Sequence, residues 1–451
     1  SAMQNTFSQA KLNFQTGDNS DLMLVLREFY SPLSKDPGAL TSAEVRTNPR
    51  QASARNVQFN AGEEIRQEEM GLRFRNRFSA GKEFTATTYL LHRDFQSRQA
   101  FFDGGQVQFD RWVGGLMLQF VNDHQLFNRP NRFLIGVDYG MQNDNRQRFN
   151  NNFGVRDTLN LSQIERVQSV GPFFRNEWNM LDKLDLVMGG RWDWLHYQVK
   201  DAFKTDGNQS GSRTVAQASG SIGLVYHLTE QQQIYTHVAS VFEAPTTTEL
   251  LNNPAGRGGF NPRLNAQTSL SNELGIRGNT AGFQYDTAVF FIRTWDEITP
   301  FELPSSPGRA FFRNAGQSRR LGVETRLATP EWKGLRGEVS YTYSNFEFEK
   351  YVVNDTNLQG NRFPGIPTHR WEGLVRYAHP LGFFGQIHVQ RVGDFFVNDT
   401  NTATTHAYHL GQFLLGWEAK RNGIEGSVFV GINNLFDAQY NANTRINAAL
   451  G

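Results

Sequence analysis

The sequence contains no cysteine and no long hydrophobic run. Without cysteine, the chain has neither a disulfide framework nor a thiolate metal site. Its apolar stretches are short, such as Leu22–Leu26, whereas a membrane-spanning helix needs roughly 18 consecutive apolar residues. The formal net charge is only +1, which provides no electrostatic footprint for nucleic acid. These absences exclude a helical membrane protein, a disulfide scaffold and a nucleic-acid-binding protein.

Aromatic residues, by contrast, are abundant in a polar background. Only 38% of the 451 residues are hydrophobic, but 13% are aromatic, including 37 Phe. A disordered chain would be poor in aromatics. A transmembrane β-barrel needs an apolar outer band, aromatic girdles and a wet interior, and this composition supplies all three. A large soluble β-protein remains the alternative on composition alone.

Extended segments with alternating polarity recur along the whole chain, and we count eighteen of them. Most are long enough to cross a bilayer as a tilted strand, which takes about 9–11 residues. Their approximate ranges are 5–16, 20–30, 64–76, 82–95, 109–120, 132–143, 169–180, 183–199, 217–228, 232–243, 269–279, 282–298, 316–329, 334–348, 369–379, 383–397, 408–420 and 426–436.

Each segment has one apolar and one polar face, because successive side chains of a strand point to opposite sides. In 64–76, Met70, Leu72 and Phe74 alternate with Arg73 and Arg75. Charges on an inward face are costly in a dry core but are tolerated in a water-filled lumen. The alternation therefore predicts a wall with lipid on one side and water on the other.

The connections between segments alternate between short and long. Short turns such as 79–81, 181–182 and 280–281 are followed each time by a longer connection, and 121–131 is the longest member of the short series. The long connections are 31–63, 96–108, 144–168, 200–216, 244–268, 299–315, 349–368 and 398–407. Short periplasmic turns and long extracellular loops are typical of an outer-membrane barrel. Brief helices are expected at 157–165 and 243–251, inside two of the long loops.

Several motifs, which keep the family order along the chain, resemble those of the TonB-dependent outer-membrane receptors. Asn434-Leu435-Phe436-Asp437 with Tyr440 resembles the C-terminal signature of that family, and Phe242-Glu243-Ala244-Pro245-Thr246 resembles its "F-x-A-P-T" segment. The further motif positions are Asn261 and Pro262 in an "NPxL" run, and Asn314 with Gly316 in an "NAG" strand start. The resemblance covers most of the chain, and the loops look closest to the ferric-dicitrate-like branch.

The resemblance implies an all-β transmembrane barrel, but one with parts missing. Barrels of this type have about 22 strands and a plugged lumen, whereas about eighteen strands are present here. We therefore interpret residues 1–451 as the barrel domain without its N-terminal plug, TonB box, first strands and last strand. The alternative is that the eighteen strands close on one another, as porin barrels do.

The ligand is expected at long outer loops that are rich in arginine and aromatic residues. Arginine presents a planar fork of donors that suits carboxylates and chelate oxygens, and aromatic faces hold flat organic surface. The predicted ligand-binding residues are Arg257, Arg263, Arg309, Phe311, Phe312 and Arg313. No catalytic constellation is present. The spacing of His406 and His409 could bind a metal and the turn 398–401 could hold calcium, but solvated loop residues are the favoured interpretation of both.

The resemblance implies a non-enzymatic importer in the outer membrane of a Gram-negative bacterium. Its ligand would be a ferric siderophore or ferric carboxylate, without a bound cofactor, and its partners would be the TonB–ExbB–ExbD complex, outer-membrane lipid and lipopolysaccharide. The same receptor class also imports cobalamin, redox cofactors or glycans, and these stay open. A plug-less porin-like diffusion channel is the second hypothesis.

Overall fold

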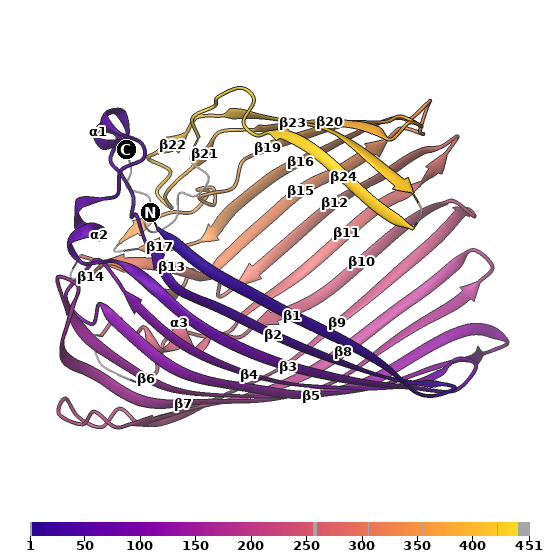
Figure 1. Ribbon diagram of the computed structural model, residues 1–451. Coiled ribbons are helices and arrows are strands. Elements are labelled where there is room, and N and C mark those ends of the chain that lie inside the picture. Colours follow the sequence, from indigo (N-terminus) through magenta and orange to yellow (C-terminus); the bar gives the residue numbers. More distant parts are fainter. Residues whose placement is uncertain (1, 256–258, 305, 354, 422, 441–451) are drawn as a thin grey trace.

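Eighteen long strands form one antiparallel sheet that curves into a wall around a wide interior (Figure 1). The computed structural model describes residues 2–255, 259–304, 306–353, 355–421 and 423–440. The strands of the wall are β1 (Met3–Gly17), β2 (Ser20–Lys35), β3 (Gly62–Ser79), β4 (Lys82–Arg98), β5 (Gln106–Leu126), β6 (Arg129–Asn152), β7 (Val155–Leu181), β8 (Leu184–Asp201), β9 (Gly211–Thr229), β10 (Gln232–Glu243), β11 (Gln267–Thr280), β12 (Phe283–Trp295), β15 (Gln317–Ala328), β16 (Leu335–Lys350), β19 (His369–Ala378), β20 (Phe383–Val392), β23 (Tyr408–Arg421) and β24 (Ile424–Ile432). The predicted eighteen strands and the all-β fold are confirmed.

Each strand of the wall pairs with the strands before and after it in the chain. Among the described residues, β1 pairs only with β2, and β24 pairs only with β23. Figure 1 shows these two strands facing each other across an opening in the wall. The eighteen strands therefore do not close on one another, unlike those of a porin.

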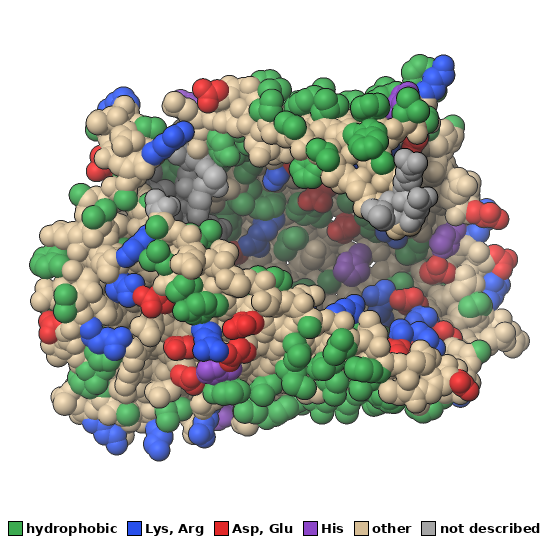
Figure 2. All heavy atoms as spheres, in the orientation of Figure 1, with side chains coloured by type: hydrophobic (Ala, Val, Ile, Leu, Met, Phe, Trp, Pro, Cys, Tyr) green, Lys and Arg blue, Asp and Glu red, His purple; other side chains and the backbone are tan. Residues whose placement is uncertain are grey.

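The two faces of the wall differ as the alternation predicts. Outward side chains are apolar and exposed: Met70 is 49%, Ile222 51% and Leu274 58% exposed. Inward side chains are charged and paired across strands, such as Arg75 with Asp21 at 2.7 Å. Figure 2 shows both features, with hydrophobic side chains on the outer surface and charged ones visible inside the opening.

One end of the wall carries the tight turns, and the other, which we call the loop end, carries the remaining elements (Figure 1). These are α1 (Ser42–Thr47), α2 (Ala54–Gln58), α3 (Thr247–Leu251), and the two-stranded pairs β13–β14 (Ile298–Leu303, Ser306–Asn314), β17–β18 (Val352–Val353, Thr356–Asn357) and β21–β22 (Phe395–Phe396, Thr404–Thr405). The expected helix at 243–251 is confirmed by α3. Within the described ranges, no helix combines the length and apolar composition that crossing a bilayer requires.

Two predictions about the loops are wrong. Residues 144–168 are not a loop, and 157–165 is not a helix: β6 and β7 continue through this region and are joined by a two-residue turn at Phe153 and Gly154. Both turn residues have positive φ, 48° and 92°, as a tight hairpin turn requires. The connection predicted at 96–108 is also shorter, because β4 ends at Arg98 and β5 begins at Gln106.

Small hydrophobic cores lie at the loop end. One consists of Tyr197, Leu250 and Leu264, with Ile298 and Phe312 packed against it. It joins the inner face of β8, helix α3 and the β13–β14 hairpin. A second core, around Phe348 and Tyr351, lies beside β16. These cores hold α3 and the hairpin against the inside of the wall, where they cover the candidate site.

Candidate anion-binding site

The inner face of β5–β7 carries a buried set of charged side chains at the loop end. Strand register places Asp144 of β6 between Arg111 of β5 and Glu165 of β7. Asn143 and Arg166, which are the register pair next to Asp144 and Glu165, are polar and lie on the outward face of the wall. The charged set therefore lies beyond the apolar band that faces the membrane.

Two arginines of this set have carboxylate partners. Arg111 forms a bidentate pair with Asp144, at 2.8 Å from Nε and 2.5 Å from Nη2. Arg146 pairs through Nε with Glu165 at 2.8 Å. Asp144 and Glu165 are 0% and 1% exposed. Burial raises the pKa of Glu165, and the opposing effect of Arg146 is smaller, so the neighbouring cation only partly offsets the cost of desolvating this carboxylate.

Two further arginines lack such partners. Arg148, which is 8% exposed, donates from Nη2 to Oδ1 of Asn252 at 2.8 Å, and its Nε has no hydrogen-bond partner. Arg309 of β14 reaches the same Asn252 oxygen at 3.4 Å. In the described part of the chain, no carboxylate lies within ion-pair distance of Arg148 or Arg309. Two guanidinium groups thus converge on one neutral amide oxygen.

Burial and mutual repulsion make these two charges costly. Burial, followed by the nearby guanidinium groups of Arg309 and Arg146, holds the pKa of Arg148 well below its usual range. Burial also lowers the pKa of Arg309, whose guanidinium lies 4.9 Å from the centre of the Phe311 ring. The charge of Asp103 opposes the shift of both arginines but is outweighed. An anion with two or more oxygens would relieve both costs, because it can accept from both arginines.

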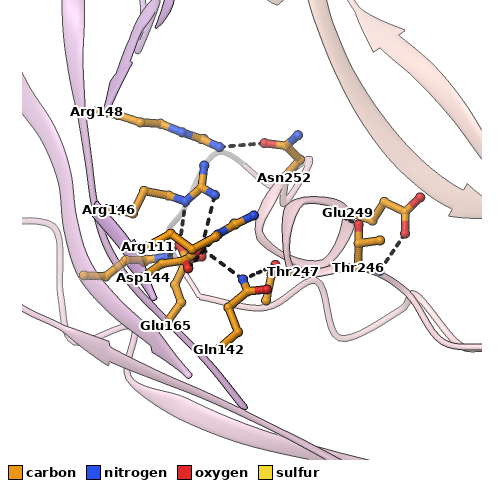
Figure 3. Close-up of polar contacts among 11 residues, drawn as sticks. Arg111, Gln142, Asp144, Arg146, Arg148, Glu165, Thr246, Thr247, Glu249 and Asn252 are labelled. Carbon is orange, nitrogen blue, oxygen red and sulfur yellow. Dashed lines mark hydrogen bonds and ion pairs between the residues drawn. The ribbon is translucent and has the colours of Figure 1, made fainter. Parts of the chain in front are cut away.

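Helix α3 supplies the cover of this site (Figure 3). It begins with a capping box in which Thr246 Oγ1 accepts from the Glu249 amide, and Glu249 Oε2 accepts from the Thr246 amide at 2.7 Å. Gln142 donates to Asp144 at 3.1 Å and to Thr247 of α3 at 3.5 Å. Asn252 directly follows the helix, so α3 positions the oxygen that Arg148 and Arg309 share.

The structure separates the predicted ligand-binding residues. Arg309 lies beside Arg148 at Asn252, and its guanidinium contacts the ring of the 2% exposed Phe311. Phe312 points the other way, into the core around Leu250, because neighbouring residues of a strand face opposite sides. Arg313 donates to the Tyr351 hydroxyl, Arg263 is exposed, and Arg257 lies outside the described residues.

The motif residues near α3 connect the loops to one another. Pro245 is buried, and its carbonyl accepts from the Tyr197 hydroxyl at 2.9 Å; Phe242 is half-buried at the end of β10. Asn261 donates from its amide nitrogen to the Phe312 carbonyl at 3.3 Å, and the adjacent Pro262 is exposed.

The remaining motif residues also have structural contacts. Asn314 donates to the carbonyls of Asn265 and Asp296. Gly316 has φ +85°, and a Cβ there would lie 2.4 Å from the Lys350 carbonyl oxygen, so only glycine fits. After β24, the Asn434 side chain closes a turn with Ala438, Leu435 and Phe436 lie against Gly411, and Tyr440 stacks on Tyr408 at 4.8 Å.

Sequence reasoning missed Arg146, Arg148 and Glu165 because they lie in the region predicted to be a loop, and it did not single out Arg111 within the predicted strand 109–120. A usable signal is present: Asp144, Arg146 and Arg148 are two residues apart, which is the spacing of one strand face. In the described residues, no group of three or more His, Asp or Glu side chains is placed to hold a metal ion. In the turn 398–401, the Asn398 side chain hydrogen-bonds to Thr402: its Nδ2 donates to the Thr402 hydroxyl, and its Oδ1 accepts from the Thr402 backbone amide.

Comparisons with known proteins bear on the family. A family model described as "TonB dependent receptor-like, beta-barrel" matches residues 4–435. The pesticin receptor of Yersinia enterocolitica is 23% identical over 448 residues, covering 86% of this chain and 63% of the relative. The ferrioxamine B receptor of Salmonella typhimurium is 21% identical over 329 residues, covering 68% of this chain and 44% of the relative. The chain thus spans less than two thirds of the length of these relatives.

Solved structures show the same fold. The unliganded ferric citrate transporter FecA superimposes with a TM-score of 0.81 at 13% identity, covering 97% of this chain and 66% of the other. The ferric yersiniabactin receptor FyuA of Yersinia pestis gives 0.73 at 17% identity, again covering 97% and 66%. With the family match across nearly the whole chain, these results show that the protein belongs to the TonB-dependent receptor-like β-barrel family and lies in the outer membrane of a Gram-negative bacterium.

Proposed function

We propose that this chain is the barrel of an active importer that takes up an anionic ferric chelate, such as a ferric siderophore or ferric carboxylate. The supporting observation is the buried Arg148 and the half-buried Arg309, two cations that share one amide oxygen and have no carboxylate within ion-pair distance among the described residues. The loop end, where this pair lies, is the extracellular end of such a receptor. The relatives and structural neighbours are receptors or transporters whose names include ferrioxamine B and ferric citrate.

The rest of the importer is part of the same proposal. The complete protein would supply a plug inside the wall and the strands that fill the opening between β24 and β1. TonB, driven by ExbB and ExbD, would act on the plug from the periplasm, and lipid with lipopolysaccharide would surround the wall. The charged inward residues, such as Arg75 and Arg191, would then face the plug and the transport path.

Ferric citrate binding to the purified full-length receptor tests the site. Arg148→Gln and Arg309→Gln should each weaken binding by about 10- to 100-fold, since a hydrogen bond to a charged group contributes roughly 1.5–3 kcal/mol. Arg166→Gln is the matched control, because Arg166 is next to Glu165 on β7 but points outward to Asn143. Titration calorimetry measures the Kd. Unchanged affinity in both arginine variants would refute the anion site.

Uptake of radioactive iron by cells tests the active step. Import of ferric citrate should stop when a protonophore collapses the inner-membrane gradient or when TonB is absent, while surface binding stays. Import that continues under both conditions would indicate passive diffusion and would contradict the proposal.

A further inference from the structure

A cavity of about 380 Å³ lies at the loop end, beside β15 and β16. Phe346, Phe348 and Phe363 form its aromatic side, and Glu297, Arg320 and Asp399 are its charged lining residues. Arg320 and Phe346 are register partners on the inward face, opposite the exposed pair Arg319–Glu347. The cavity therefore opens inside the wall, on the same side as the arginine pair.

Two of the three charges in the lining neutralise each other. Arg320 pairs with Glu297 at 2.5 Å, and Glu297 also accepts from the Ser318 hydroxyl at 2.5 Å. The Arg320 guanidinium lies 5.2 Å from the centre of the Phe363 ring. This aromatic side already holds one cation, which shows that the rings can take part in cation–π contacts.

The third charge, Asp399, has no cationic partner in the described structure. Its Oδ2 accepts only from the Tyr351 hydroxyl, at 3.2 Å. Arg313 donates to the same hydroxyl at 3.3 Å, and its positive charge stabilises the Asp399 carboxylate only in part, because burial outweighs it in the pKa of Asp399. Burial raises the pKa of Asp399, which is the effect of desolvating a carboxylate without enough compensating charge. The cavity lining keeps one negative charge beside three aromatic rings.

Strand β14 connects this cavity to the arginine pair. Arg309 and Arg313 are four residues apart and face the same side of the strand, so their Cα atoms are separated by roughly 13 Å. Arg309 belongs to the site with surplus positive charge, and Arg313 contacts the Tyr351–Asp399 pair. One elongated ligand can therefore reach both sites.

We infer that the imported chelate is zwitterionic: its anionic iron-binding head is held by Arg148 and Arg309, and a protonated amine on its arm enters the aromatic cavity and pairs with Asp399. This inference rests on the proposed function. An ammonium group fits the cavity because the half-buried Phe346 ring lines it and attracts a cation, while Phe348 and Phe363 stack on each other behind it, and because Asp399 supplies the counter-charge. A neutral arm would leave that half-buried carboxylate without a full counter-charge.

Three ferric complexes test the inference on the full-length receptor. The first is ferric citrate, which has no arm. The second is the ferric complex of citrate joined by an amide to 1,10-diaminodecane, whose ten-carbon arm is long enough to span the two sites and ends in a free amine. The third is its N-acetylated twin, which has the same arm without the charge. We expect the amine form to bind about tenfold more tightly than the acetyl form, from the combined cation–π and ion-pair contacts.

Asp399→Asn should bring the ratio of the two affinities close to one and leave the Kd of the acetyl form unchanged. Asp394→Asn is the matched control, because Asp394 is an exposed acid of the same loop outside the cavity lining. Phe346→Leu, which removes a ring but keeps an apolar side chain, should also reduce the ratio. If Asp399→Asn does not fold, the affinity ratio measured for Phe346→Leu tests the inference in its place.

The outcomes separate the two proposals. Equal affinities of the amine and acetyl forms for the wild-type receptor would refute the zwitterionic ligand, as would a preference that survives both Asp399→Asn and Phe346→Leu. In either case ferric citrate binding that depends on Arg148 would still support the anion site. Failure of all three complexes to bind would refute both proposals.

Discussion

At the scale of single residues, the site combines satisfied and unsatisfied charges a few ångströms apart. Arg146 and Glu165 compensate each other, whereas Arg148 has only an amide oxygen. A buried charge without a partner costs several kcal/mol, and a protein seldom keeps one for stability. Arg148 and Arg309 are therefore better explained by a bound anion that supplies the missing charge than by their contribution to the fold.

The first prediction concerns Glu165→Gln, which leaves the Arg146 guanidinium without its counter-ion. Breaking one partner of a buried pair typically costs about 3–5 kcal/mol, so the thermal unfolding midpoint should fall. The same change adds surplus positive charge next to Arg148, so ferric citrate should bind more tightly. Circular dichroism during heating and titration calorimetry measure the two effects.

Glu347→Gln is the control for this prediction, because the Arg319–Glu347 pair lies on the exposed outer face. Exposed pairs contribute about 0–1 kcal/mol, and the midpoint should barely move. A Glu165→Gln variant that is as stable as the wild type, or that binds ferric citrate more weakly, would contradict the electrostatic account of the site.

At the scale of elements, helix α3 has only five residues and depends on its cap and its packing. Thr246→Ala removes one half of the capping box and should cost about 1 kcal/mol. The backbone amides of α3 should therefore exchange about fivefold faster in this variant. Because α3 positions Asn252, the affinity for ferric citrate should change by a similar factor. Hydrogen exchange detected by mass spectrometry measures the first effect.

Thr248→Ala is the matched control within the same helix, because Thr248 is exposed and is not the capping residue. If both variants speed exchange equally, the cap does not hold the helix. If Thr246→Ala speeds exchange but leaves affinity unchanged, α3 covers the site without positioning it.

The elements also show what sequence reasoning can and cannot recover. Strands inside the membrane were predictable, because outward residues such as Met70 and Leu72 must be apolar while inward residues need not be. Beyond the membrane that contrast ends: near the tips of β6 and β7, Asn145 faces outward and Arg146 inward, and both are polar. The alternation of hydrophobicity disappears there although the strands continue, so residues 144–168 resembled a loop.

The same limit explains which residues of the proposed site the sequence analysis named. Arg309 and Phe311 were predicted because they lie in a recognisable loop that is rich in arginine and aromatic residues. Arg148 was not, because its distinguishing property is the lack of a carboxylate partner at the end of a strand. Whether Arg148 has a carboxylate partner depends on how α3 packs against strands β5–β7, and this packing cannot be read from a single sequence.

At the scale of the whole molecule, the wall separates two solvents with a single layer of strands. Its outer face presents apolar residues such as Ile222 and Leu274, and its inner face presents paired charges such as Arg191 with Asp138. Such a layer is stable in a bilayer only when every backbone amide has a partner, because an unsatisfied group in hydrocarbon costs several kcal/mol. The outer edges of β1 and β24 are therefore the weak points of the eighteen-strand wall.

The last prediction follows from these edges. If the complete receptor places further strands between β24 and β1, as we propose, the amides of β1 that point away from β2 are hydrogen-bonded. In the full-length receptor they should exchange with deuterium as slowly as the amides of β12, which is flanked by β11 and β15. Hydrogen exchange with peptide-level mass spectrometry compares the two strands in one experiment. If half of the β1 amides exchange fast while β12 stays protected, β1 is a true edge and the barrel is not completed by other strands.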